Sequence, residues 1–65
     1  MTDLEIYIYW ATNYDALNQR AVVGAITDET ADRLVRNMEE RLGVQTWTVD
    51  RWRAAYDAWR RELGA

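Results

Sequence analysis

The residue types that carry most enzyme chemistry are missing from this chain of 65 residues. It contains no histidine, cysteine, serine or lysine. These residues supply most nucleophiles and the general base that works near neutral pH. The sequence therefore predicts a protein that is not an enzyme and that has no catalytic residue.

The carboxylates are the remaining groups that could do chemistry. Glu39 and Glu40 are neighbours in a predicted helix, so their side chains point about 100° apart and cannot work as a pair. Asp28 and Asp32 share a helix face and could hold a cation weakly, but acids near a helix start also interact favourably with its dipole. There is no thiolate for a metal, and the three glycines are too widely separated to form a phosphate loop. We expect no metal, no cofactor and no small-molecule ligand.

Aromatic and arginine side chains could instead bind a protein partner. Tyr7 and Tyr9 share one face of a predicted strand, where a partner, the second helix or a dimer mate would cover them. Trp47 either packs on Trp52 as a hydrophobic staple at a helix start or anchors an interface. The arginines of the last helix either meet an acidic partner or lie on a solvated face. The candidate partner-binding residues are Tyr7, Tyr9, Trp47, Arg51, Arg53 and Arg60.

Charge and composition narrow the class of partner. The net charge is −3, with six acids and one arginine through residue 32, and seven arginines and five acids after it. This distribution does not indicate a broad nucleic-acid footprint. Four tryptophans are many for so short a chain, and formation of a homodimer would be one way to bury part of their apolar surface. The acidic start and the lack of a long apolar run predict a cytoplasmic protein without a membrane partner.

The expected fold starts with two strands. Apolar and polar residues alternate over residues 4–10, which predicts a half-buried strand. Residues 11–19 are expected to form the connection. Residues 21–26 form a short apolar run rich in β-branched residues, which predicts a second, fully buried strand.

Two helices are expected to follow. Thr27 would cap the first and Gly43 would end it, with a single apolar stripe between them. The second would begin near Thr48 and end at Gly64. Residues 44–47 are either a short third strand or a loop. The chain is therefore predicted to be one α+β domain over residues 1–65, with a small antiparallel sheet, one helix packed across it and a C-terminal amphipathic helix.

One resemblance supports this fold. Residues 23–29 read Val-Gly-Ala-Ile-Thr-Asp-Glu and residues 47–50 read Trp-Thr-Val-Asp. In these segments the chain resembles small uncharacterised β-β-α-β proteins of phages and their hosts. The resemblance implies a fold and an accessory role in which the protein binds a host or phage protein.

A second resemblance covers about a third of the chain. Residues 42–44 and 48–53 look like the turn and recognition helix of a helix-turn-helix, as in small phage excisionases. Glu39 departs from the motif, which has a small residue there because its two helices touch, and a carboxylate would be buried without a partner. The residues that this resemblance would place on DNA are Gln45, Thr46, Trp47, Asp50, Arg51 and Arg53.

These observations favour a non-enzymatic accessory protein, related to phages, that acts through protein–protein interaction and self-associates as a homodimer. The alternative is a helix-turn-helix protein that binds DNA, similar to a small excisionase or regulator.

Overall fold

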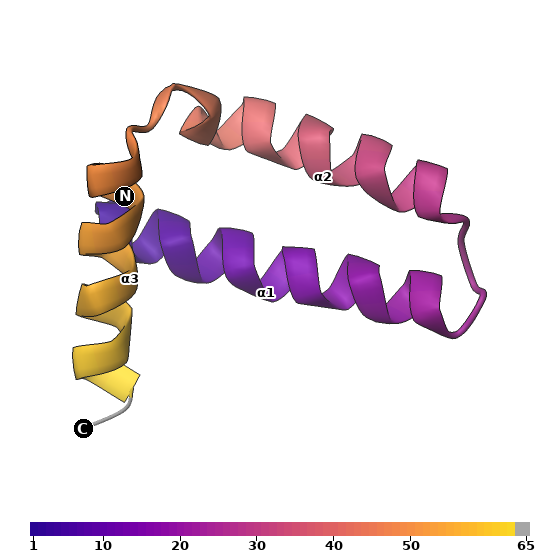
Figure 1. Ribbon diagram of the computed structural model, residues 1–65, viewed down its shortest axis with the longest axis horizontal. Coiled ribbons are helices and arrows are strands. Elements are labelled where there is room, and N and C mark those ends of the chain that lie inside the picture. The colour runs from indigo at the N-terminus through magenta and orange to yellow at the C-terminus, as the bar shows by residue number, and fades with distance from the viewer. Residues whose placement is uncertain (64–65) are drawn as a thin grey trace.

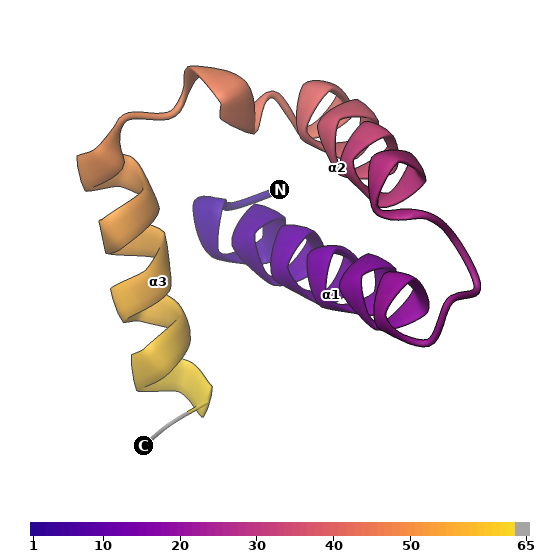
Figure 2. The ribbon, with the colours of Figure 1, turned by 45° about the vertical axis from the view of Figure 1, so that its right-hand side comes forward.

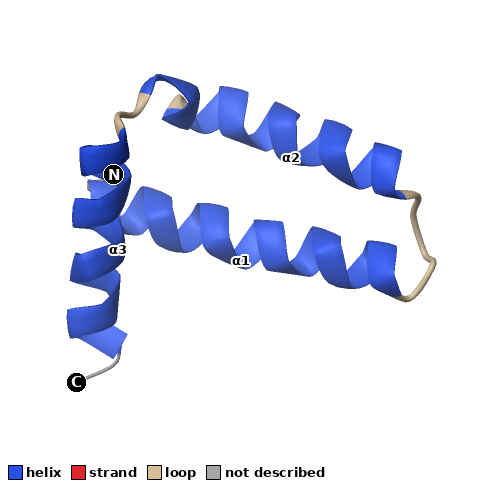
Figure 3. Ribbon diagram, in the orientation of Figure 1, coloured by secondary structure: helices blue, strands red, loops and turns tan. Residues whose placement is uncertain are grey.

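The computed structural model describes residues 1–63, and these residues form three α-helices and one short 3₁₀ helix (Figure 1). Figure 3 shows no strand in this part of the chain. The prediction of an α+β fold is therefore wrong, and the resemblance to β-β-α-β proteins fails with it because residues 1–63 contain no sheet for a helix to cover. In the same range, no helix combines the length and the apolar character that crossing a membrane requires.

The first helix, α1 (Asp3–Val22), occupies the region predicted to be two strands and a connection. Its start is set by a capping box. The Thr2 hydroxyl accepts a hydrogen bond from the Glu5 N–H at 3.2 Å, and the Glu5 carboxylate accepts one from the Thr2 N–H at 3.0 Å. No glycine or proline then interrupts the chain before Gly24. Local capping and an unbroken helical stretch outweigh the alternation of residues 4–10.

Gly24 ends α1 and explains why residues 21–26 are not a strand. Its φ is +79°, a left-handed conformation that glycine adopts without strain. The Gly24 N–H donates to the Ala21 carbonyl at 3.1 Å, and the Ala25 N–H donates to the Arg20 carbonyl at 2.9 Å. This pair of bonds is a Schellman motif, which satisfies carbonyls left free at a helix end.

The second helix, α2 (Asp28–Leu42), confirms the predicted boundaries. The Thr27 hydroxyl accepts a hydrogen bond from the Thr30 N–H at 3.1 Å, and Gly43 has a φ of +72°. Of the predicted apolar stripe, Ala31 and Met38 are buried. The stripe therefore marks the side of α2 that faces the rest of the chain.

After α2, the 3₁₀ helix η1 (Val44–Thr46) and α3 (Val49–Leu63) complete the described chain. Residues 44–47 thus form a connection between helices, and the alternative of a third strand is wrong. The Thr48 hydroxyl accepts from the Arg51 N–H at 3.2 Å, which confirms the predicted helix start. Trp47 and Trp52 have ring centroids 4.9 Å apart, so the predicted contact between them is also confirmed. The predicted stop at Gly64 lies outside the described residues.

Helix α1 is the centre of the arrangement. It runs antiparallel to α2, and α3 crosses the N-terminal end of α1 at a steep angle (Figure 1, Figure 2). Helices α2 and α3 both pack on α1 and do not pack on each other. The chain therefore forms a helical hairpin with a third helix across one end.

This arrangement leaves a small core and a large surface. Only five hydrophobic residues in the described chain are buried, and none belongs to α1. The radius of gyration is 12.9 Å, against about 11 Å for a compact domain of this length. The solvent-accessible surface is 4965 Å², against about 4,300 Å² for a folded chain of 7.7 kDa. The buried residues are Ala31, Met38, Val44, Trp47 and Ala55.

Candidate functional site

The site with the most unusual composition is a cluster of aromatic rings where α1 meets α3. Tyr7 lies at its centre, and its ring centroid is 5.9–6.2 Å from those of four other rings in tilted or edge-on arrangements. Edge-on and tilted pairs at this distance are attractive beyond the area they bury. The four rings are those of Trp10, Trp52, Tyr56 and Trp59.

A shallow groove with a volume of about 350 Å³ opens beside this cluster. Tyr7 and Trp10 line it from α1, while α3 contributes three apolar residues and one arginine. The groove is open to solvent because Val49 is 72% exposed and Tyr56 is 40% exposed. Such an apolar surface suits a protein partner better than a small polar ligand. The lining residues from α3 are Val49, Trp52, Arg53 and Tyr56.

The electrostatics of the groove do not suit acid–base chemistry. Partial burial raises the pKa of the Tyr7 hydroxyl, and the neighbouring Tyr56 raises it further. The hydroxyl therefore stays neutral at physiological pH and acts as a polar tip on an apolar ring. Arg53 and Arg60 are exposed beside the rings, with the Arg60 guanidinium carbon 5.9 Å from the Tyr56 ring centroid.

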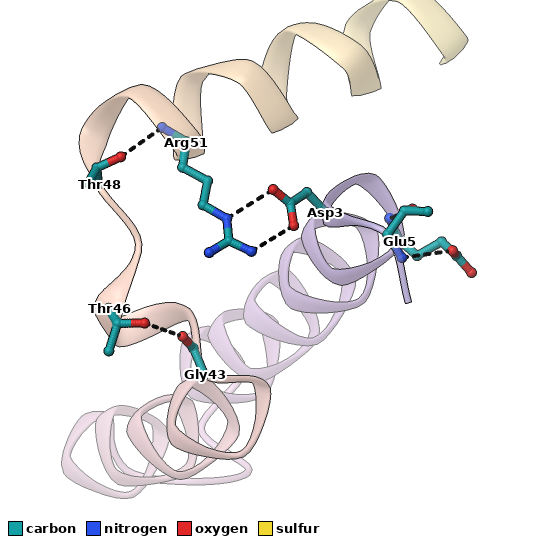
Figure 4. Close-up of polar contacts among 7 residues, drawn as sticks. Asp3, Glu5, Gly43, Thr46, Thr48 and Arg51 are labelled. Atoms are coloured by element: carbon teal, nitrogen blue, oxygen red, sulfur yellow. Dashed lines mark hydrogen bonds and ion pairs between the residues drawn. The ribbon is translucent and has the colours of Figure 1, made fainter.

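The structure buries Trp47 in the core and leaves Arg51 partly exposed, where it is engaged with two other residues of the same chain. Trp47 is only 9% exposed and belongs to the core. The guanidinium carbon of Arg51 lies 4.5 Å from the Trp47 ring centroid. Arg51 also donates two hydrogen bonds of 2.9 Å to the carboxylate of Asp3, so it joins the starts of α3 and α1 (Figure 4). Both residues are occupied by contacts within the chain.

The ion pair between Asp3 and Arg51 shifts both groups toward their charged forms. Hydrogen bonds from Arg51 hold the pKa of Asp3 below its ordinary value of 3.8. The same bonds raise the pKa of Arg51. Because both side chains are close to half exposed, solvent screens the attraction and the pair contributes geometry more than energy.

Tyr9 lies apart from the groove. In a helix, residues two positions apart point about 200° from each other, so the prediction that Tyr7 and Tyr9 share a face is wrong. Tyr9 is 49% exposed and belongs with Ile8 and Met1 to a second apolar patch on α1. Of the six candidate residues, the structure therefore brings only Tyr7, Arg53 and Arg60 to the aromatic groove and its edge.

The helix-turn-helix resemblance is not supported by the fold. In that motif the two helices pack on each other, whereas α2 and α3 are separated by residues 43–48 and each packs on α1. Glu39 is not an unpaired carboxylate at a contact between these helices, because it accepts a hydrogen bond from the indole of Trp10 at 3.0 Å. The Thr46 hydroxyl donates to the Gly43 carbonyl at 3.0 Å (Figure 4). With Trp47 and Arg51 also engaged, half of the residues that the resemblance would place on DNA make contacts within the chain.

The sequence prediction missed most of the groove. Trp10 falls in the strand predicted over residues 4–10, and Val49, Trp52 and Tyr56 fall in the predicted C-terminal helix, but none of them is among the candidate partner-binding residues. A helical interpretation of residues 3–22 would have found the α1 side, because residues 7, 10 and 14 recur at spacings of three and four. Tyr14 extends the cluster by stacking on Trp10 at 5.0 Å. No comparable pattern among neighbouring residues predicts that this side of α1 packs against α3.

Within residues 1–63, no group of three acidic side chains lies close enough together to hold a metal ion. Comparisons with protein-family models, with curated proteins and with solved structures give no match, so the geometry of the chain carries the functional argument.

Proposed function

We propose that this protein is a non-enzymatic protein-interaction module that self-associates in the cytosol, with the aromatic groove between α1 and α3 as its binding surface. The observation that carries the proposal concerns α1. This helix of 20 residues contacts both other helices, yet none of its residues is buried.

The distribution of apolar residues around α1 supports the proposal. Leu17 lies on the side toward α2, Tyr7 lies toward α3, and Ile8 lies on a third side that neither helix covers. Apolar side chains therefore lie on more sides of α1 than the two that α2 and α3 cover, and the apolar part of a helix surface is typically buried against another element. One chain supplies only two of the necessary neighbours, so a further protein surface is needed to cover the remainder.

The size of the solvent-accessible surface also supports association with a further protein surface. The chain exposes several hundred Å² more than a compact protein of its mass, as given above. A stable protein–protein interface buries about 800 Å² on each partner. Association would therefore restore the surface-to-mass ratio of an ordinary folded protein.

Analytical ultracentrifugation of the full chain over a wide concentration range tests the proposal. The expected result is a weight-average mass that rises above 7.7 kDa as concentration increases, with a midpoint that defines a dissociation constant. A mass that stays at 7.7 kDa up to about 1 mM, where even a binding free energy near −4 kcal/mol would be detected, would contradict self-association.

A further inference from the structure

We infer that the surface covering the aromatic groove is a second copy of this chain, with the two α3 helices side by side and antiparallel about a two-fold axis at the level of Ala55. This inference rests on the proposed self-association and adds its geometry. Three features of α3 carry it: a stripe of charges, the apolar edge beside that stripe, and the absence of ion pairs for these charges within residues 1–63.

The first feature is a stripe in which charge alternates along one face of α3. Its four members are separated by three, four and three residues, which places them on one side of a helix. All four are exposed. Read from the start of α3, their signs are negative, positive, negative and positive. The stripe consists of Asp50, Arg53, Asp57 and Arg60.

This stripe is complementary to itself only when two copies run in opposite directions. When the two-fold axis lies at the level of Ala55, a residue that precedes Ala55 by a given number of positions is level with the residue that follows Ala55 by the same number in the second copy. With a rise of about 1.5 Å per residue, Arg53 is level with Asp57 of the second copy, and Arg60 is level with Asp50 of the second copy. Symmetry doubles each pair, so all eight charges meet an opposite charge. A parallel pairing in register would set each charge against itself.

The second feature is an apolar edge directly beside the stripe. Val49 and Tyr56 lie one residue before Asp50 and Asp57, and both line the groove and are exposed. Leu63 continues the edge and is 66% exposed. An antiparallel second α3 brings its own Val49 and Tyr56 over this edge and over the Tyr7 and Trp10 rings. The apolar edge supplies the buried area, and the charges set the direction and register.

The third feature is that the stripe residues form no ion pair within residues 1–63, where Arg60 lies 5.9 Å from the Tyr56 ring and keeps its charge unpaired by a carboxylate. Charges at these spacings can pair along their own helix. In the part of the chain that the structure describes, the one ion pair joins Arg51 to Asp3, and no stripe residue forms one. The arginines and aspartates of the stripe are therefore available to another molecule.

Charge reversal tests the inference. Arg53→Glu sets this residue against Asp57 of the second copy, and Asp57→Lys sets it against Arg53 of the second copy, so each variant alone should raise the dimer dissociation constant at least about tenfold. The double variant R53E/D57K restores opposite charges at both positions and should return the constant to within a few-fold of the original. An equimolar mixture of the two single variants should form a heterodimer. Arg36→Glu, an exposed arginine on α2, is the control for the change in net charge and should leave the constant unchanged.

The outcomes separate this inference from the proposal on which it rests. A parent chain that self-associates but is unaffected by either reversal would overturn the α3 pairing and leave self-association standing. Reversals that weaken association without rescue in the double variant would also overturn it. A parent chain that is monomeric at all concentrations would overturn both.

Cross-linking supplies a second readout that does not depend on the charges at positions 53 and 57. The chain has no cysteine, so introduced thiols are the only ones present. A mixture of Asp50→Cys and Arg60→Cys chains should form a disulfide between the two variants, while each variant alone should not, because its two copies are about 15 Å apart along the helix axis. Self-linking of Asp50→Cys would indicate a parallel pair and overturn the inference.

Discussion

The indole N–H of Trp10 donates a hydrogen bond of 3.0 Å to the carboxylate of Glu39 and thereby ties α1 to α2. The two residues are 29 positions apart in the sequence, and the bond is partly buried. The bond satisfies the indole N–H, which is a polar group within the aromatic cluster. It also holds the Trp10 ring against Trp52, with centroids 4.9 Å apart. A contact between α1 and α2 thus helps to shape the groove between α1 and α3.

Removal of this acceptor should destabilise the fold. Glu39→Ala loses a hydrogen bond to a charged group and should lower the free energy of unfolding by about 1.5–3 kcal/mol. Glu39→Gln keeps an acceptor of similar shape and should recover about half of that loss. Urea unfolding followed by tryptophan fluorescence measures both. Equal losses for the two variants would mean that the charge, and not the acceptor, is what Trp10 requires.

The ion pair between Asp3 and Arg51 should make stability depend on pH. Because Arg51 depresses the pKa of Asp3 in the folded state, the stabilisation is fully present above the ordinary value of 3.8 and is lost as the pH falls through the folded value. The melting temperature of the parent chain should therefore exceed that of Asp3→Asn at neutral pH, and the difference should vanish in acid. Arg51→Gln should show the same pattern, and the double variant should add little to either single change. Independent, additive effects would contradict direct pairing.

Replacement of Gly43 should destabilise the fold through its backbone conformation and not through contacts with neighbouring side chains. Its φ is +72°, and a Cβ built there would meet nothing within 4 Å. Gly43→Ala should therefore cost about 1–2 kcal/mol of unfolding free energy through backbone strain alone. Gly43→Asn should cost less, because asparagine tolerates the left-handed region better. Gly24, with a φ of +79° and the same open space, should respond in parallel in thermal unfolding.

Trp47 should prove to be a core residue and not an interface anchor. It is 9% exposed and packs on Trp52, so Trp47→Ala should destabilise the fold by about 3–5 kcal/mol. For a chain with so small a core, this loss should be visible as a loss of helical circular dichroism at room temperature. The exposed Arg60 gives the contrast, because Arg60→Ala should change unfolding by less than about 0.5 kcal/mol. A well-folded Trp47→Ala chain would contradict the assignment.

Val49 should matter to association and not to folding. It is 72% exposed at the edge of the groove, so Val49→Ser should leave the unfolding of the dilute monomer within about 0.5 kcal/mol. In the dimer, each copy would lose a buried apolar side chain, and the dissociation constant should rise about tenfold. Val22 is 80% exposed at the far end of α1, and Val22→Ser should leave association unchanged. Equal effects at both valines would mean that the groove is not the contact surface.

Sequence reasoning succeeded where one local signal had no competitor. Helix α2 begins after Thr27 and ends before Gly43 as expected, and Thr48 caps α3. It failed for residues 3–26, where two patterns compete. Residues 4–10 alternate like a strand, yet Thr2 and Glu5 form a capping box and Gly24 adopts the same left-handed stop as Gly43. Both helix signals lie in the sequence, but the strand prediction rests on the alternation and the apolar run alone and takes neither cap into account.

The amino-acid sequence by itself determined where the helices begin and end, because capping depends on hydrogen bonds between residues only a few positions apart. Only the tertiary structure decided which aromatic rings are buried and which remain free. Trp47 lies in the core and Tyr56 at the open groove because of where α3 crosses α1, and that crossing depends on packing between residues more than 40 positions apart. Such packing depends on the shapes of both helices together, so neither segment alone specifies it.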